Sequence, residues 1–479
     1  MAGKYGTYAH AGALQQAFDL NIKKVLEHWT VPFAIRELIA NALDEQVLTG
    51  TADPEIYKDA FGYWHISDAG RGVRYEHLTQ NENAEKRSHA EAIGQFGMGL
   101  KDALAVFDRR GVGVVIRSPH AVITTGRRPK EGFPDVVTLH ALVAPPSDRG
   151  RAGTDITLSG VKDADMDAAR RFFLRYSGER LLESTEYGAV LARTDARQPA
   201  RIYVKGLLVA EEPNFLFSYN ITKLSASLRR ALNRERSNVG RSAYSDRVKT
   251  ILTACQSTAV AAPLADDLNA YTAGQLHDEL AWRDVTLHAC RVLQTNEKVI
   301  FVTAWQMAEG TAQIRYARDD GYRIVVVPED IARSLGSLTD LNGKPLVDLD
   351  RYRTEWNSSF SFAFVNPAAM TLAEQSVYQR TRDIAAVASV DLSRSKTAVL
   401  ISETMRLSDA GDPVLGIWEA AERRIVIRRD QLASLSRYAG TLLHEISHMT
   451  SGTTDGTLDF ESELSRLLGI AAAAALDHR

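Results

Sequence analysis

The sequence predicts an α+β protein of several domains. Its 479 residues are enough for about three domains. Amphipathic patterns with helical spacing occur at 35–44 and 441–449, and short apolar runs suited to buried strands occur at 298–303 and 322–327. The content of 45% hydrophobic and 24% charged residues is ordinary for a globular chain. The motifs described below divide the chain into four segments: 1–165, 166–255, 256–400 and 401–479.

The segment from Ile35 to Asp44 is expected to form a helix with two different faces. Glu37, Asn41 and Asp44 are four and three residues apart, so they share one face, and apolar residues fill the opposite face. An amide oxygen such as that of Asn41 is a hard ligand for Mg²⁺, and a carboxylate such as Glu37 can orient or deprotonate a water molecule. By itself this pattern also fits an ordinary amphipathic helix with a solvated charged face.

Two glycine-rich turns follow. A short strand at 63–67 ends in the turn Asp68-Ala-Gly70-Arg-Gly72, whose glycines let a ligand approach the backbone closely. The second turn runs into a helix, and its members are Gly94, Gly97, Gly99, Leu100 and Lys101. Backbone amides at such a helix N-terminus bind phosphate well. Residues 74–91, between the turns, are polar and are expected to form a lid that orders over a bound nucleotide.

A fourth element, the expected strand Gly153–Leu158, begins with Gly153-Thr154. The four elements, in this order, resemble the nucleotide site of the gyrase, heat-shock chaperone, histidine-kinase and MutL superfamily (GHKL, or Bergerat-fold, ATPases), and the 94–101 loop resembles its Microrchidia branch. The resemblance implies an α/β sandwich that binds Mg²⁺ and ATP in a homodimer. It assigns Asn41 as the Mg²⁺ ligand, Glu37 as the general base and Asp68 as the acceptor for the adenine amino group. The remaining nucleotide-binding residues would be Asp44, Gly70, Gly72, Thr154 and the members of the second turn.

A basic segment at 229–249 follows an expected hairpin at 200–209. Its members are Arg229, Arg230, Arg234, Arg236, Arg241, Arg247 and Lys249. In GHKL enzymes a transducer domain sends a basic residue to the γ-phosphate, so the resemblance implies this role for Arg234, Arg236 or Arg241. Two other interpretations stay open: a phosphate-contacting surface for DNA or RNA, and a solvated basic helix.

Residues 256–400 predict a small α/β connecting domain. It would contain the two short strands named above and a helix that opens near 328–330. The sequence carries no recognisable catalytic constellation in this segment.

The last segment carries the pattern His444-Glu445-Ile446-Ser447-His448 inside an apolar helical repeat. The two imidazoles lie one turn apart and can reach one Zn²⁺, and Glu445 can act as a base on metal-bound water. Before this helix, 414–419 and 424–428 indicate a pair of strands. The arrangement resembles the zincin peptidases, which hold an extended peptide along an edge strand beside the metal. The alternatives are a helix with a decayed motif or two histidines with a merely structural role.

The third metal ligand is left open among three acidic residues. Glu461 is preferred because it shares a helix face with Leu464 and Leu468 that is expected to face the core, where a glutamate needs a cation. Asp455, in the turn at 452–456, is the second candidate, and Glu463 is the third.

The composition indicates where in the cell the protein is expected to act. No apolar run approaches the length of a membrane span, so no membrane partner is expected. Cys255 and Cys290 are the only cysteines and form no C-x-x-C pair, which favours the reducing cytoplasm. The net charge of −3 argues against a protein that coats nucleic acid along its whole surface.

Taken together, the motifs predict a two-site enzyme. The nucleotide state of an ATPase would control a zinc peptidase-like site acting on a peptide or protein substrate. The pairing of the two domains suggests prokaryotic stress or phage defence. The alternative is an ATP-driven dimeric clamp or chaperone that acts on nucleic acid or a client protein and carries a structural zinc.

Overall fold

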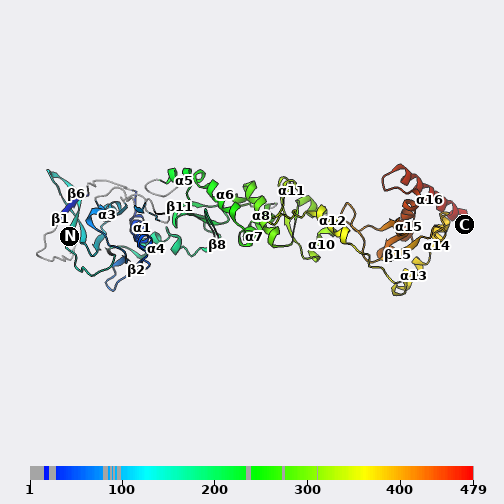
Figure 1. Ribbon diagram of the computed structural model, residues 1–479, viewed down its shortest axis with the longest axis horizontal. Coiled ribbons are helices and arrows are strands. Elements are labelled where there is room, and N and C mark those ends of the chain that lie inside the picture. The colour runs from blue at the N-terminus through cyan, green and yellow to red at the C-terminus, as the bar shows by residue number, and fades with distance from the viewer. Residues whose placement is uncertain are drawn as a thin grey trace. The chain divides into compact units, whose positions relative to one another are not determined.

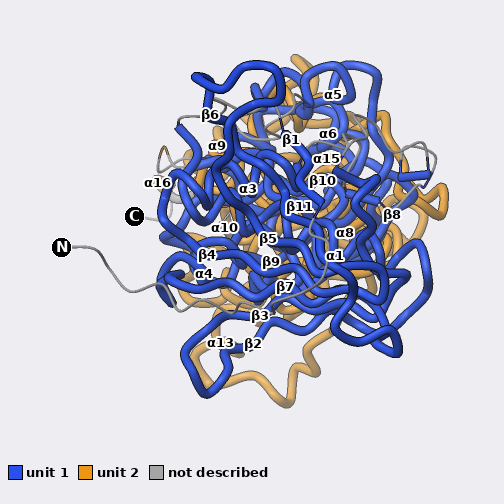
Figure 2. The backbone as a smooth tube through the Cα atoms, turned by 90° about the vertical axis from the view of Figure 1, so that its left-hand side faces the viewer, with its two compact units in different colours: residues 1–264, 276–289 blue, residues 265–275, 290–479 orange. Residues whose placement is uncertain are grey.

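The computed structural model describes residues 16–20, 28–78, 85–86, 89, 92–93, 99–232, 239–271, 274, 276–309 and 311–477. These residues form an α+β protein with four sheets. They divide into two units, shown in Figure 2: unit 1 comprises 1–264 and 276–289, and unit 2 comprises 265–275 and 290–479. Within the described part of the chain, no helix is both long enough and apolar enough to cross a membrane.

Unit 1 begins with a seven-stranded sheet in the order β1-β6-β5-β4-β7-β3-β2, whose neighbouring strands are all antiparallel. Figure 1 labels three of these strands, β1, β2 and β6. The strands are β1 (Gln16–Asp19), β2 (Glu55–Lys58), β3 (Trp64–Asp68), β4 (Gly113–Arg117), β5 (Val122–Lys130), β6 (Phe133–Ala144) and β7 (Thr154–Ser159). Apolar residues alternate along β3, so Trp64 and Ile66 join one core with helices α1 (Val31–Thr49), α3 (Gly99–Arg110) and α4 (Asp163–Arg170). The strand expected at 63–67 is therefore confirmed.

Helix α1 is buried on both of its faces. Its sequence enters the helix with Pro32 and leaves it at Gly50, which has a left-handed φ of 65°. Besides the apolar face, Glu37 is only 8% exposed and Asp44 only 1%. The interpretation as an ordinary helix with a solvated charged face is therefore wrong, because these carboxylates point into the protein.

A five-stranded sheet with the order β11-β10-β12-β9-β8 completes the sheets of unit 1. The strands are β8 (Arg180–Thr185), β9 (Gly188–Ala192), β10 (Ala200–Val204), β11 (Leu207–Glu212) and β12 (Ser218–Ile221). The predicted hairpin at 200–209 is confirmed, since β10 and β11 pair antiparallel around the turn Lys205-Gly206. The helices that follow are α5 (Ala226–Ala231), α6 (Ser245–Ala254), α7 (Thr258–Asn269) and α8 (Arg283–Asn296).

The basic segment does not form one helix. Its described residues are divided among α5, a 3-10 turn at Arg241–Ala243 and α6. The interpretation as a single solvated basic helix is therefore wrong.

Unit 2 opens with two parallel strands, β13 (Val299–Val302) and β14 (Arg323–Val326), which confirm the strands predicted in the connecting segment. The helix expected near 328–330 is α11 (Glu329–Leu335). The other helices around this small sheet are α9 (Ala304–Glu309), α10 (Thr311–Asp319) and α12 (Leu349–Ser359). Their shared core contains Ile300, Ile314 and Tyr352.

The rest of unit 2 contains a three-stranded sheet in the order β15-β17-β16. Strands β16 (Gly416–Glu419) and β17 (Arg424–Arg428) pair antiparallel as predicted, and β15 (Ala398–Ser402), which the sequence did not indicate, pairs parallel with β17. Helices α13 (Leu372–Tyr378), α14 (Thr381–Val387), α15 (Leu435–Ser451) and α16 (Leu458–Asp477) accompany the sheet. The core residues Met370, Ile425 and Leu442 belong to one cluster, so this fold begins before residue 401.

Candidate functional site

Unit 1 contains a cavity of about 350 Å³, which we call the unit 1 pocket. Segments far apart in the sequence line it: α1, the end of β3, the start of α3 and β7. Six of the residues predicted to bind nucleotide line this pocket: Asn41, Asp68, Gly72, Gly99, Leu100 and Thr154. The described structure thus brings together one residue or more from each of the four sequence elements.

Other predicted residues lie beside the pocket or outside the described residues. Glu37, Asp44, Gly70 and Lys101 are described but do not line it. Glu37 is close to it nonetheless, because a Cβ on Gly99 would overlap Glu37 Oε2. The predicted residues Gly94, Gly97, Arg234 and Arg236, and most of the expected lid at 74–91, lie outside the described residues.

The carboxylate of Glu37 is held by a buried arginine. Arg36 is 0% exposed, and its Nη2 and Nε donate to Glu37 Oε1 over 2.7 and 3.1 Å. The guanidinium also lies 5.1–5.5 Å from the ring centres of Trp29, Phe33 and Phe172. These contacts fix one oxygen of Glu37 and leave Oε2 directed toward Gly99. Sequence analysis did not identify Arg36, because a buried cation on the apolar side of a helix leaves no spacing signal.

Asp68 is fixed by backbone groups on both sides. Its Oδ1 accepts hydrogen bonds from the amides of Gly70 (2.9 Å) and Thr154 (3.3 Å). Burial raises the pKa of Asp68 above its usual value although these hydrogen bonds oppose the shift. Gly153 must be glycine here, because its φ is 71° and a Cβ would collide with the Asp68 carbonyl oxygen. A glycine next to Thr154 therefore lets β3 and β7 meet at the pocket.

Lys86 lies between Asn41 and Asp44, the other two polar residues that the sequence predicted on the same face of α1 as Glu37. Lys86 Nζ lies 2.9 Å from Asn41 Oδ1 and 3.0 Å from Asp44 Oδ2. The other oxygen of Asp44 accepts a hydrogen bond of 2.6 Å from the amide of Ile93. Asp44 therefore binds two points of the segment that follows the Asp68 turn.

Of the three arginines expected to reach the γ-phosphate, Arg241 alone lies within the described residues, and its partners lie elsewhere in unit 1. Arg241 donates to Asp278 over 2.6 Å, and its guanidinium lies 4.7 Å from the centre of the Phe215 ring. It is not among the residues that line the unit 1 pocket. Lys205, in the turn between β10 and β11, donates instead to the carbonyl oxygen of Ala92 over 3.2 Å. Its only sequence signal was the Lys-Gly turn of the hairpin.

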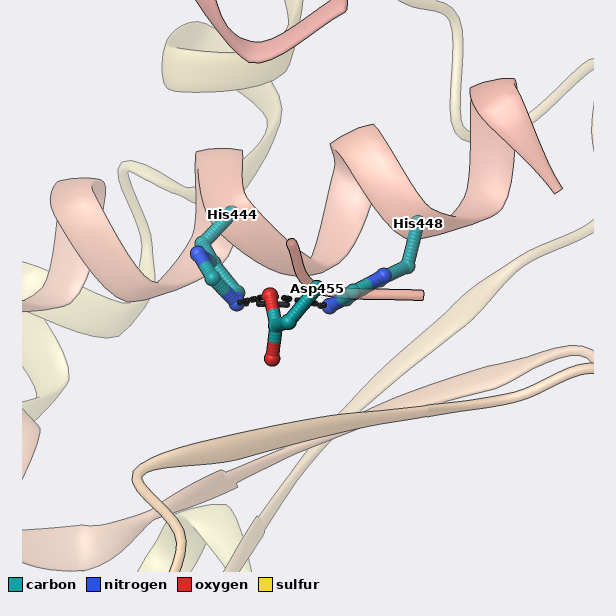
Figure 3. Close-up of side chains that lie close together, drawn as sticks. All are labelled: His444, His448 and Asp455. Atoms are coloured by element: carbon teal, nitrogen blue, oxygen red, sulfur yellow. Dashed lines mark hydrogen bonds and ion pairs between the residues drawn. The ribbon is translucent and has the colours of Figure 1, made fainter. Parts of the chain in front are cut away.

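In unit 2, His444, His448 and Asp455 form the one group of three metal-ligand residues found among the described residues, here called the His-His-Asp cluster. Figure 3 shows the two imidazoles leaving the same side of α15 and pointing toward Asp455. Asp455 Oδ1 lies 3.1 Å from His444 Nε2 and 3.3 Å from His448 Nε2, and the two nitrogens are 3.3 Å apart. His448 is oriented by its Nδ1, which lies 2.8 Å from the Thr453 carbonyl oxygen and donates to it.

Asp455 reaches the imidazoles because the chain reverses after α15. Gly452 ends the helix with a left-handed φ of 69°, and the following turn returns to the side where the histidines lie. Glu461 does not join the cluster, and it is exposed. The expectation that it faces the core was therefore wrong. Phe460 and Leu467 are the described residues of α16 that are buried. Glu463 does not join it either. It pairs with Arg466 at 2.7 Å, and this ion pair lowers the pKa of Glu463 to about 2.

Glu445 lies in the same cavity of about 830 Å³ as the His-His-Asp cluster. It is only 4% exposed, and burial, with a smaller contribution from Asp455, raises its pKa to about 8. Strand β16 passes directly over it, since a Cβ on Gly416 would approach Glu445 Oε1 to 2.7 Å. The cavity therefore combines a ligand cluster, a carboxyl group of raised proton affinity and the edge strand of a sheet.

Comparison with known proteins gives a family but no activity. A family model described as the Mycoplasma pneumoniae MPN635 N-terminal domain matches residues 164–258. An uncharacterized protein of Mycoplasma pneumoniae (strain ATCC 29342 / M129 / Subtype 1) is 37% identical over 239 residues, which are 49% of this chain and 95% of that protein. The chain belongs to the family of this mycoplasmal protein.

A second uncharacterized protein of the same organism is 38% identical over 103 residues, or 21% of this chain and 29% of that protein. The match at 164–258 covers the five-stranded sheet and α6. The residues of the unit 1 pocket and of the His-His-Asp cluster fall outside that range.

Proposed function

We propose that this protein is a GHKL ATPase, related to heat-shock chaperones, MutL and the Microrchidia proteins, that binds and hydrolyses ATP with Mg²⁺ in the unit 1 pocket. One observation carries the proposal: four elements separated along the sequence supply Asn41, Asp68, Gly99 and Thr154 to a single cavity. A chance set of turns and helices has no reason to converge in this way.

The chain's own groups fit such a ligand. Asn41 Oδ1 and Asp44 Oδ2 already bind a cation, the ammonium of Lys86, which stands in for a metal ion at the amide oxygen. Asp68 supplies a buried acceptor suited to an exocyclic amino group, which favours adenine. Glu37, held by Arg36, is the residue that would orient or deprotonate the attacking water.

We propose further that the His-His-Asp cluster binds zinc in a zincin-like metallopeptidase site. A tetrahedral zinc with bonds of about 2.0–2.1 Å separates its ligand atoms by roughly 3.3 Å. The three separations of 3.1, 3.3 and 3.3 Å in the cluster match this value. Bound zinc would supply a Lewis acid that lowers the pKa of a coordinated water. Glu445 would accept the proton of that water, and β16, an outer strand of its sheet, would hold an extended peptide or protein substrate.

The two sites would act together, with the nucleotide state of unit 1 controlling cleavage at the cluster in a homodimer. We place this activity in prokaryotic stress or phage defence. The test measures bound metal, ATP hydrolysis and cleavage of peptides or of the chain itself in one purified sample. Glu37→Ala should lower hydrolysis by about 10²–10⁴-fold, and Glu55→Ala, on the exposed strand β2, is its matched control.

Glu445→Gln should abolish cleavage while metal content and hydrolysis stay unchanged, with the exposed Glu461→Gln as control. Cleavage that ignores both ATP and the Glu37→Ala change would refute the coupling. A wild-type sample that binds neither ATP nor metal would refute both sites.

A dimeric clamp or chaperone acting on nucleic acid or a client protein, with structural zinc, is the second candidate. The observation in its favour is that Arg229 and Arg230 of α5 are exposed. If reversing both charges abolishes duplex binding while Glu445→Gln leaves function intact, this candidate replaces the peptidase.

A further inference from the structure

The unit 1 pocket contains a cation that belongs to the chain itself. Lys86 Nζ lies within hydrogen-bonding distance of Asn41 Oδ1 (2.9 Å) and Asp44 Oδ2 (3.0 Å). The Lys86 side chain is 15% exposed and that of Asp44 is 1% exposed, so this ion pair is largely removed from water. We call these two contacts the Lys86 latch.

The latch and a bound metal ion cannot use Asn41 at the same time. Mg²⁺ binds oxygen at about 2.0–2.1 Å and requires a near-octahedral shell, whereas an ammonium donates a hydrogen bond from about 2.9 Å. Two cations sharing one amide oxygen would also repel each other in a poorly solvated cavity. Coordination at Asn41 therefore requires that the ammonium of Lys86 leaves.

A second set of contacts, through Arg71, attaches the residue next to Lys86 to helix α1. Arg71 Nη1 donates to both oxygens of Glu85 at 3.0 Å, and its Nε donates to Glu45 Oε1 at 2.8 Å. Burial alone would raise the pKa of Glu45, but the hydrogen bonds from Arg71 outweigh it and hold this pKa below its usual value. Residues 85 and 86 are thus attached to α1 at adjacent positions, Glu85 through Arg71 and Lys86 directly.

We propose that Lys86 is a built-in competitor for the metal position of the unit 1 pocket, so that loading of Mg²⁺ with nucleotide is coupled to release of residues 85–86 from α1. The inference rests on the proposed function, because it takes Asn41 as the metal ligand. It adds a regulatory role for a residue that the ATPase motifs do not include. A nucleotide without Mg²⁺ would leave the latch in place, and Mg²⁺ would be needed to open it.

The test uses Lys86→Met, which removes the ammonium and keeps most of the stem. Lys58→Met, on the exposed strand β2, is the matched control, and Lys86→Arg keeps the charge. The first measurement is the Mg²⁺ concentration that half-saturates binding of a fluorescent ATP analogue to the full chain. Since a hydrogen bond to a charged group contributes enough to change an equilibrium roughly tenfold, Lys86→Met should lower this concentration by roughly tenfold. Lys86→Arg and Lys58→Met should stay near wild type.

The second measurement is hydrogen exchange of a peptide that contains residues 85–93, without nucleotide. Lys86→Met should speed its exchange, and Lys58→Met should not. Unchanged exchange, or a variant that needs more Mg²⁺ than wild type, would overturn the competitor role. If wild type binds no nucleotide at any Mg²⁺ concentration, the proposed function fails, and the exchange comparison alone decides whether the latch holds residues 85–86.

Discussion

Replacing Arg36 by methionine should destabilise unit 1 more than the loss of an ordinary ion pair. Arg36 is 0% exposed and its partner Glu37 is 8% exposed, so the substitution leaves a buried carboxylate without its cation. Breaking a buried pair in this way costs about 3–5 kcal/mol. The ring contacts with Trp29, Phe33 and Phe172 contribute roughly 0.5–2 kcal/mol each, of which methionine recovers part through dispersion. We therefore expect a loss of at least about 4 kcal/mol in the local stability of α1.

The double variant Arg36→Met/Glu37→Gln separates charge from packing. It removes both charges, so it should cost less than the sum of the single variants by at least about 2 kcal/mol. Because the chain has two units, its unfolding is not described by a single transition. Native-state hydrogen exchange of the amides in α1 instead measures the local opening free energy in the full chain. A loss below about 1 kcal/mol for Arg36→Met, or simple additivity in the double variant, would refute the reasoning.

Three further predictions follow from particular contacts. Asp455→Asn should weaken metal binding by at least roughly tenfold in calorimetric titration, whereas Glu461→Gln should leave it unchanged; equal effects would exclude Asp455 as the third ligand. The folded-state pKa of Glu445, about 8 against an ordinary 4.5, means that metal-free unit 2 holds this proton more tightly than the unfolded chain does. The contribution of this proton to stability is therefore present below pH 4.5 and is lost as the pH rises toward 8, and Glu445→Gln should remove this contribution from the pH dependence of thermal melts. Gly153→Ala should destabilise unit 1 by about 2–4 kcal/mol. Its Cβ would collide with the Asp68 carbonyl oxygen, and the left-handed φ of this residue disfavours any side chain. An unchanged melting temperature would contradict this.

The elements predicted from sequence are those in which periodicity and turn residues agree. The helix at α1, the hairpin around Lys205 and the strands β13, β14, β16 and β17 all combine an apolar repeat with clear ends. Strand β15 was not predicted, because Ala398–Ser402 is short and its parallel partner β17 lies more than twenty residues further along the chain. Pairing at that separation depends on the fold and leaves no local pattern.

The site residues that the sequence pattern missed or ranked second are positioned by turns and by neighbouring elements. Helical spacing favoured Glu461, yet the structure brings Asp455 to the histidines from the turn that follows Gly452. Spacing rules apply within a helix and say nothing about where a chain returns after a left-handed residue. Arg36 and Lys86 were missed for a related reason: each compensates a carboxylate of α1 from a direction that a helical wheel does not show.

Three of the buried carboxyl groups, those of Glu37, Asp44 and Glu445, are compensated in ways that differ in permanence. Glu37 is paired with Arg36, whose guanidinium is fixed among three rings. Asp44 is paired with Lys86, a point charge on a flexible stem that can leave when another cation arrives. Glu445 has no paired cation among the described residues, and burial raises its pKa to about 8. A fixed cation suits Glu37, a carboxylate that must hold one orientation. An ammonium that can leave suits Asp44, and a proton that can leave suits Glu445, because in the proposed reactions these two positions would exchange a positive charge. On this physical basis Glu37 is the fixed part of the proposed ATPase and Lys86 is its point of control, while Glu445 is the group that exchanges a proton at the proposed zinc site of unit 2.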